Sequence, residues 1–253
     1  MPVRPRPRIP GAAPRRSLGR RIAAVVAAAT TALLVASSAA VADPGTVYVD
    51  GKGNVGAGHD FFGGVPPTNG DNVGVGYSVM PSITTGIRNV AVGSDNLRFL
   101  TTGGNNVATG TAALYADTSG SSNIASGSYA LQTNTTGNEN IASGFFALGG
   151  ATMTGDGNIA TGTMALLANT TGDDNIATGT NALQLNTSGN SNVASGTGAL
   201  THNTVGNDNV ATGFEAMPAN TTGHLNVASG KDALFRNTTG DENVADGQRA
   251  LFA

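Results

Sequence analysis

Apolar and polar positions along most of this chain recur with a period of 17 residues, interrupted by two steps of 18. The phase is set by an Asn that precedes Val or Ile. Repeat positions are counted from this Asn, so that the Val or Ile stands at +1. Gly occupies +4 in every copy, and a large apolar residue occupies +8, from Phe62 to Leu251. Such self-similarity predicts a repeat fold built from twelve units, which begin at Asn54, Asn72, Asn89, Asn106, Asn123, Asn140, Asn158, Asn175, Asn192, Asn209, Asn226 and Asn243.

The residue types within the repeat predict a β-solenoid. Seventeen residues are too few for a helical hairpin, and the many Gly and β-branched residues disfavour helix. Each copy is expected to contain a short strand such as "NIAT" (175–178), a Gly turn, a second segment such as "NALQL" (181–185) and a return turn such as "NTTG" (169–172). The predicted fold is all-β, a parallel β-roll of about twelve 17-residue coils.

Stacking of similar coils predicts continuous ladders of identical side chains. Parallel strands of neighbouring coils lie about 4.8 Å apart, so eleven steps between twelve coils give a rod of roughly 53 Å. The Val/Ile column at +1 and the large apolar column at +8 are expected to form apolar ladders. The Asn column is expected to form an amide ladder in which each side chain bonds its copy in the next coil.

Residues 1–42 do not follow the repeat and are typical of a secretory signal peptide. Seven Arg and no acidic residue occupy positions 1–21, an apolar run extends from Ile22 to Val35, and a cleavage site follows Ala42. The run has about 14 residues, whereas a membrane-spanning helix needs roughly 20. The stretch "RRSL" (15–18) leaves a twin-arginine export signal open. The predicted organisation is a signal peptide (1–42), a lead-in (43–50) and a repeat domain (51–253), in a protein located outside the cell or at its surface.

Composition narrows the range of partners. Without residues 1–42 the chain keeps 13 minus 7, or 6, basic residues against 16 acidic ones, so its net charge is near −10. An acidic surface repels nucleic acid and anionic lipid, so no nucleic-acid partner and no membrane insertion after signal cleavage are expected. Cys is absent, which excludes disulfides and thiolate chemistry.

The folding free energy estimated for one coil favours the assembly of several chains. Two large aliphatic side chains per coil contribute about 1.5 to 3 kcal/mol each when fully buried. Fixing the backbone costs about 1 to 2 kcal/mol for each of the 17 residues, which exceeds the contribution of the buried side chains. Hydrogen bonds worth a net of about 1 kcal/mol apiece reduce this difference without clearly offsetting it. We therefore expect a second buried surface, formed by oligomerisation along one of the apolar ladders.

Copies such as "GDDNIATGTNAL" (172–183) and "GNDNVATGFEAM" (206–217) resemble the head repeats of trimeric autotransporter adhesins of the YadA type, in which an Asn/Ser-Val-Ala-Ile-Gly phrase recurs. The stretch "NTTGDENVADGQRAL" (237–251) is also similar to repeats of phage tail fibres and bacterial surface proteins. The resemblance covers residues 51–251. It implies a left-handed β-roll, a homotrimer packed around an axis, and attachment to a host surface or matrix. The chain departs from the adhesin motif at +3, where eight of twelve copies carry Thr or Ser instead of an aliphatic residue.

No residue pattern indicates catalysis, a cofactor or a metal, and the chain is expected not to be an enzyme. His59, His202 and His224 stand at three different repeat positions, so solvated loop histidines are expected. Acidic residues just before the anchor Asn are expected on one rim of the solenoid, where a calcium site is one reading and a solvated edge the favoured one. These residues are Asp156, Asp173, Asp174, Asp208, Asp241 and Glu242.

Two further patterns leave alternatives open. N-glycosylation acceptor sequences also match what the return turn needs, and turn residues are the expectation at Asn134, Asn169, Asn186, Asn220 and Asn237. Thr or Ser at both +3 and +5 would present a hydroxyl grid, broken where +5 is Phe145, Phe214, Lys231 or Gln248. The grid pairs are Thr109/Thr111, Ser126/Ser128, Thr161/Thr163, Thr178/Thr180 and Ser195/Thr197.

The function predicted first is a secreted, non-enzymatic protein for surface attachment or extracellular structure, which resembles an adhesin head. The alternative is a solenoid that binds ice or a crystal surface through its Thr/Ser ladders. Contacts with a ligand are expected to differ from coil to coil at variable positions such as Phe145, Phe146, Phe214 and Lys231.

Overall fold

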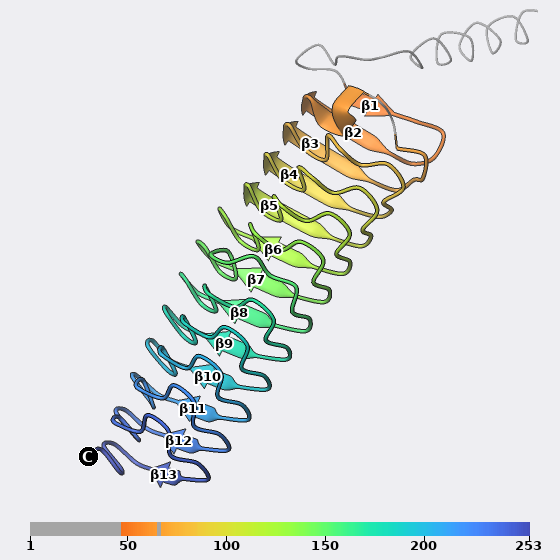
Figure 1. Ribbon diagram of the computed structural model, residues 1–253. Coiled ribbons are helices and arrows are strands. Elements are labelled where there is room, and N and C mark those ends of the chain that lie inside the picture. The colour runs from red at the N-terminus through yellow and green to blue at the C-terminus, as the bar shows by residue number, and fades with distance from the viewer. Residues whose placement is uncertain (1–46, 65–66) are drawn as a thin grey trace, which may run out of the picture. The chain divides into compact units, whose positions relative to one another are not determined.

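The computed structural model describes residues 47–64 and 67–253, so the predicted signal peptide lies outside the described residues. The described chain confirms the all-β solenoid (Figure 1). Its thirteen strands form one sheet whose order follows the sequence, and a short 3-10 turn, η1 (Phe61–Gly64), lies after the second strand. The rod therefore grows by one coil for each copy of the repeat.

Each repeat contributes one strand that begins at +1. The first strand, β1 (Val47–Val49), precedes the repeats and pairs antiparallel with β2, whereas all later pairs are parallel and in register. For example, Ile176, Ala177 and Thr178 face Val193, Ala194 and Ser195. The repeat strands are β2 (Val55–His59), β3 (Val73–Tyr77), β4 (Val90–Ser94), β5 (Val107–Thr111), β6 (Ile124–Ser126), β7 (Ile141–Ser143), β8 (Ile159–Thr161), β9 (Ile176–Thr178), β10 (Val193–Ser195), β11 (Val210–Thr212), β12 (Val227–Ser229) and β13 (Val244–Asp246).

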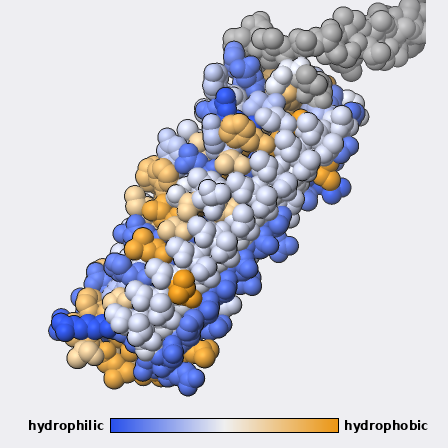
Figure 2. Space-filling model, viewed as in Figure 1, coloured by the Kyte–Doolittle hydropathy of each residue, from blue (hydrophilic) through white to orange (hydrophobic). Residues whose placement is uncertain are grey.

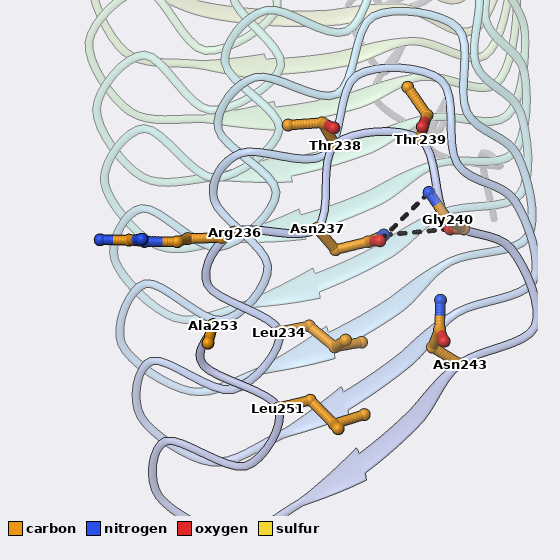
Figure 3. A pocket seen from close by; sticks show the side chains of 9 residues that line it. All are labelled: Leu234, Arg236, Asn237, Thr238, Thr239, Gly240, Asn243, Leu251 and Ala253. Atoms are coloured by element: carbon orange, nitrogen blue, oxygen red, sulfur yellow. Dashed lines mark hydrogen bonds between the residues drawn. The ribbon is translucent and has the colours of Figure 1, made fainter.

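The core of each coil is a narrow channel lined by small and large apolar residues. The Ala at +2, the Ala at +7 and the Leu at +8 are fully buried in the central coils, as Ala177, Ala182 and Leu183 show. The residue at +8 has a positive φ throughout, 51° at Leu183, which turns the chain inward so that +7 and +8 both reach the core. In Figure 3, Leu234 and Leu251 from successive coils lie one below the other.

The invariant Gly at +4 ends the strand at a bend that no larger residue can occupy. Its φ is 133° at Gly179, a backbone region that L side chains rarely adopt. A Cβ added there would stand 2.6 Å from the carbonyl carbon and oxygen of Gly196 in the next coil. Both the backbone angle and the close approach of coils therefore require Gly at this position.

The anchor Asn residues form the predicted ladder along the rod, with bonds between side-chain amides in most coils. At Asn106, Asn123 and Asn140 the backbone N alone donates to Oδ1 of the preceding Asn. The Nδ2 of Asn192 donates to Asn175 Oδ1 at 3.0 Å and to the carbonyl of Gly206 at 2.8 Å. Its own Oδ1 accepts from the backbone N and the Nδ2 of Asn209, both at 3.1 Å. Side chains of this column are buried from Asn54 to Asn226, so the ladder is an internal polar spine.

A second amide ladder runs through +11, where the sequence indicated only a turn. Nδ2 of Asn186 donates to Asn169 Oδ1 and to the carbonyl of Gly189, both at 2.9 Å, and the next coils repeat this pattern. Figure 3 shows the Asn237 side chain directed at Gly240 in the same way. Four of the five glycosylation-acceptor Asn are buried and the fifth, Asn237, is half-buried, so these side chains are structural. Their turn is held by an internal ladder.

The bonded part of this second ladder runs from Asn169 to Asn237, and Asp117 places a carboxyl group in the same column before it. The same column carries Leu100 in the preceding coil and Asn134 in the next. Asp117 Oδ1 accepts from the backbone N of Gly120 at 2.8 Å. Within the described part of the chain, Asp117 Oδ2 and Asn134 Oδ1 are buried without a hydrogen-bond partner. Burial raises the pKa of the Asp117 carboxyl to about 7, against the lowering effect of the backbone N–H groups of Gly120, Ser119 and Thr118.

Candidate interaction face

The side of the sheet that points away from the core carries the Val/Ile column. Side chains alternate along a strand, so the inward Ala at +2 forces +1 and +3 outward. We call the surface formed by +1 and +3 of β2 to β13 the outer sheet face. Exposed fractions along it include 43% for Ile124, 39% for Ile176 and 36% for Val210. Of the two large apolar columns, the one at +8 is therefore buried within the single chain, whereas the one at +1 is exposed or half-buried.

The outer sheet face is a continuous stripe of aliphatic side chains beside a stripe of hydroxyls. Val or Ile stands at +1 in all twelve strands. Thr or Ser stands at +3 from β5 to β12, whereas β3 and β4 carry Val75 and Val92 there, 38% and 41% exposed. Monomeric proteins rarely expose long uninterrupted apolar surfaces, and those that do use them for contacts. This stripe is the candidate interaction face of the protein.

Most of the Thr and Ser pairs of the predicted hydroxyl grid do not lie on a single strand. Only in β5 does one strand include both members of a predicted pair, Thr109 and Thr111. In the other four pairs the strand ends at +3, and the Gly at +4 bends the chain before +5. The regular partner of the hydroxyl column is instead the aliphatic column at +1.

A further Thr column at +12, in the return turn, forms a hydroxyl ladder that the sequence analysis missed. Thr170 Oγ1 donates to the carbonyl of Thr187 at 2.8 Å, and Thr187 Oγ1 donates to that of Thr204 at 2.9 Å. The recurring "NTTG" was the available signal, but it is equally typical of an isolated turn.

Columns of Thr, Ser and Gly have hydropathies near zero. Figure 2 shows a broad pale band along one side of the rod, with hydrophobic patches beside it.

Three of the six acidic rim residues, Asp156, Asp173 and Asp241, belong to a structural ladder. The other three, Asp174, Asp208 and Glu242, are exposed, and their carboxylates form no hydrogen bond with another described residue. Two positions before the anchor Asn, side-chain oxygens accept from backbone N–H groups of the preceding coil. Asp173 Oδ1 accepts from the backbone N of Asp156 at 2.8 Å, and Asp241 Oδ1 accepts from that of His224 at 2.7 Å. No cluster of three or more His, Cys, Asp or Glu suited to a metal occurs among the described residues. Each carboxylate of the ladder thus stabilises the contact between two coils.

The three His residues have separate local roles. His224 Nδ1 accepts from the backbone N of Asn207 at 3.0 Å, so it belongs to the rim ladder. His202 Nδ1 lies 2.9 Å from the carbonyl of Pro218, and the His59 ring stacks on Tyr77 with centroids 5.4 Å apart. They lie in different coils and share no site, as their repeat positions indicated.

The variable column at +5 carries the exposed aromatic side chains Tyr77, Phe145 and Phe214, and a further one, Phe99, stands at +10. Phe145 is 46% exposed and packs against Tyr129 and Phe146, with centroids 5.9 and 4.8 Å away. Phe214 is 47% exposed, and the Lys231 ammonium lies 5.4 Å from its ring centroid. The sequence analysis named Phe145, Phe146 and Phe214 as variable, and the structure places them away from the strands, beyond the Gly bend.

Two of the hollows on the described part of the chain bear on its surface chemistry. One, of about 310 Å³, lies at the last coil (Figure 3). It is lined by residues that include Leu234, Asn237 and Leu251, whose columns also line the interior of the other coils. The other, of about 510 Å³, lies beside Phe214.

Residues 47–64 and 67–253 include no helix long and apolar enough to cross a membrane. Comparisons with models of protein families, with curated proteins and with solved structures found no match for this chain.

Proposed function

We propose that this protein is a secreted, non-enzymatic rod for surface attachment or extracellular structure, and that its solenoids assemble as a homotrimer through the outer sheet face. The observation that carries the proposal is the unbroken column of twelve Val and Ile side chains at +1, six of which are exposed and six half-buried in the single chain. The resemblance of the repeat to adhesin heads supports three chains packed along such a column. Attachment follows from that resemblance and from the long repetitive surface of the rod.

Energetics support burial of the outer sheet face between chains. A Val or Ile side chain about 40% exposed would contribute about 0.6 to 1.2 kcal/mol if another chain covered it. The six exposed members of the column sum to roughly 4 to 7 kcal/mol per chain, and the six half-buried members add less apiece. This total is of the order of the entropy cost of association. Hydroxyls at +3 keep this face more polar than a standard core, so some of them must pair across the interface or with trapped water.

Charged substitutions on the outer sheet face are expected to dissociate the trimer. The double variant Ile176→Lys/Val210→Lys places two ammonium groups of each chain at the proposed interface, where their desolvation opposes assembly. Analytical ultracentrifugation of the purified protein is expected to give about three times the monomer mass for the wild type and the monomer mass for the variant. Both should show β-rich circular dichroism, because these side chains are exposed in the single chain.

The matched control is Thr171→Lys/Thr222→Lys, which adds the same charges at exposed positions of the return turn. This control should remain trimeric. A wild-type monomer, or a trimer that survives the Ile176→Lys/Val210→Lys change, would contradict assembly through the outer sheet face.

The second candidate function is binding to ice or to a crystal surface. It is favoured by the in-register alternation of methyl and hydroxyl columns on the outer sheet face, for example Ile176 beside Thr178 and Val193 beside Ser195. Thermal hysteresis and ice recrystallisation should be measured on folded wild-type protein. Activity that is lost in Ile176→Lys/Val210→Lys would support this candidate, and inactivity of the folded wild type would eliminate it.

A further inference from the structure

The hollow beside Phe214 exists because one coil lacks a side chain that every other coil has. Position +6 carries a side chain in eleven copies, among them Asn181 and Glu215, but it is Gly198 in the copy between these two. Gly198 has a φ of 71°, similar to the 58° of Asn181, so the backbone follows the same path without the side chain. The result is a groove of about 510 Å³, within the range of about 300 to 1,000 Å³ found for ligand sites.

One wall of this Phe214 groove is apolar. Phe214 stands at its edge, 47% exposed, while Phe235, Pro218 and Ala219 are half-buried around it. Phe235 is held by stacking on Phe252, with centroids 5.0 Å apart. The wall therefore offers rigid rings that a ligand can contact without ordering them first.

The groove is also lined by hydrogen-bonding groups. His202 Nδ1 lies 2.9 Å from the carbonyl of Pro218, and since a carbonyl only accepts, this nitrogen carries the proton. In the neutral ring, Nε2 is then left as an acceptor. Glu215 lines the groove and forms no ion pair or side-chain hydrogen bond with any other described residue. Thr197 and Asn181 add a hydroxyl and an amide.

We propose that the Phe214 groove binds a neutral saccharide unit. A pyranose ring combines a C–H face, which suits the Phe214 and Pro218 surfaces, with hydroxyls that donate to Glu215 and to His202 Nε2 and accept from Asn181. The Glu215 carboxylate and the acidic chain disfavour anionic ligands. The inference names a ligand class for the proposed attachment role, and the groove lies on the turn side of the coils, away from the outer sheet face.

Saturation-transfer NMR can test the proposal on the purified protein. The probes are methyl glycosides of glucose, galactose, mannose and N-acetylglucosamine, together with their short oligomers. At least one should give signals from its ring protons with wild-type protein. The variant Gly198→Asn should abolish them, because its side chain fills the groove with the residue that the preceding coil carries at the same position. Phe214→Ala should weaken binding by about three- to tenfold.

The matched control is Phe145→Ala, which removes an aromatic ring of the same column and nearly the same exposure, 46%, from a coil outside the groove. It should bind the same glycoside as the wild type does. The proposal is overturned if no probe binds, if binding survives Gly198→Asn, or if only a basic peptide such as tri-lysine binds. Saturation transfer detects binding by a 25.0 kDa monomer as well as by a trimer, so a monomer that binds glycoside would contradict the trimer alone.

Discussion

Replacing Asn192 with Ala is expected to lower the free energy of unfolding by about 3 to 6 kcal/mol, because the side chain holds three coils together. Its Nδ2 donates to Asn175 and Gly206, and its Oδ1 accepts two bonds from Asn209. Truncation leaves the carbonyl of Gly206 and the backbone N of Asn209 without these partners inside the rod. Urea unfolding followed by circular dichroism measures the loss, and hydrogen exchange should locate it in the coils from Asn175 to Asn226.

The matched control is Asn243→Ala in the last coil. Asn243 donates only to Asn226 Oδ1, is half-buried, and accepts no bond from another coil of the described chain. Its removal should cost no more than about 1 to 2 kcal/mol. Equal losses for the two variants would contradict the view that the ladder is a cooperative internal spine.

Replacing Asp117 with Asn is expected to stabilise the protein at pH 8 by up to about 4 kcal/mol. The pKa of the buried carboxyl is raised to about 7 from an ordinary value of 3.8, and each pKa unit corresponds to about 1.4 kcal/mol. The folded protein then binds a proton between about pH 4 and 7 that the unfolded chain has released, so wild-type stability falls as the pH rises through this window and levels off above it. Urea midpoints from pH 4 to 9 measure this slope.

The structural reason is that two buried oxygens in neighbouring coils of the +11 column, Asp117 Oδ2 and Asn134 Oδ1, both lack a hydrogen-bond donor. A protonated Asp117 could supply the donor that the unpartnered Asn134 Oδ1 lacks, and no charged side chain contributes to the shift. In the variant, the new amide has the donor that Asn186 uses toward Gly189. The control Asp246→Asn removes an exposed carboxylate and should keep the wild-type slope. A slope that persists in Asp117→Asn would assign the pH dependence to other groups.

Much of the fold could be predicted from residues that recur in every coil. Gly at +4, Leu at +8 and the anchor Asn are nearly invariant because an in-register solenoid repeats one environment twelve times, and one residue type satisfies it best. The strand at +1 to +3 and the amide ladder were predictable for this reason. The second Asn ladder was not, since "NTTG" is sufficient for a turn and gives no sign of burial.

The candidate sites depended more on contacts between coils. The acidic residues such as Asp173 suggested a rim, but their bonds to the backbone of a preceding coil connect residues 17 positions apart. The Phe214 groove likewise combines residues of four successive coils around one missing side chain at Gly198. Periodicity shows which residues share a column, whereas the depth of a column depends on how the turns between columns are bent.

The sequence by itself determined the period, the number of coils, the parallel register and the identity of the columns, because one-dimensional repetition maps directly onto stacking. Only the tertiary structure decided which apolar column is inside. Alternation along a strand places the side chains at +1 and +3 on one face of the sheet and the side chain at +2 on the other, but it does not determine which face is toward the core. The channel that closes within 17 residues is lined by Ala177 and Leu183, with Ile176 on the outside, and this leaves the aliphatic stripe at the surface of the single chain.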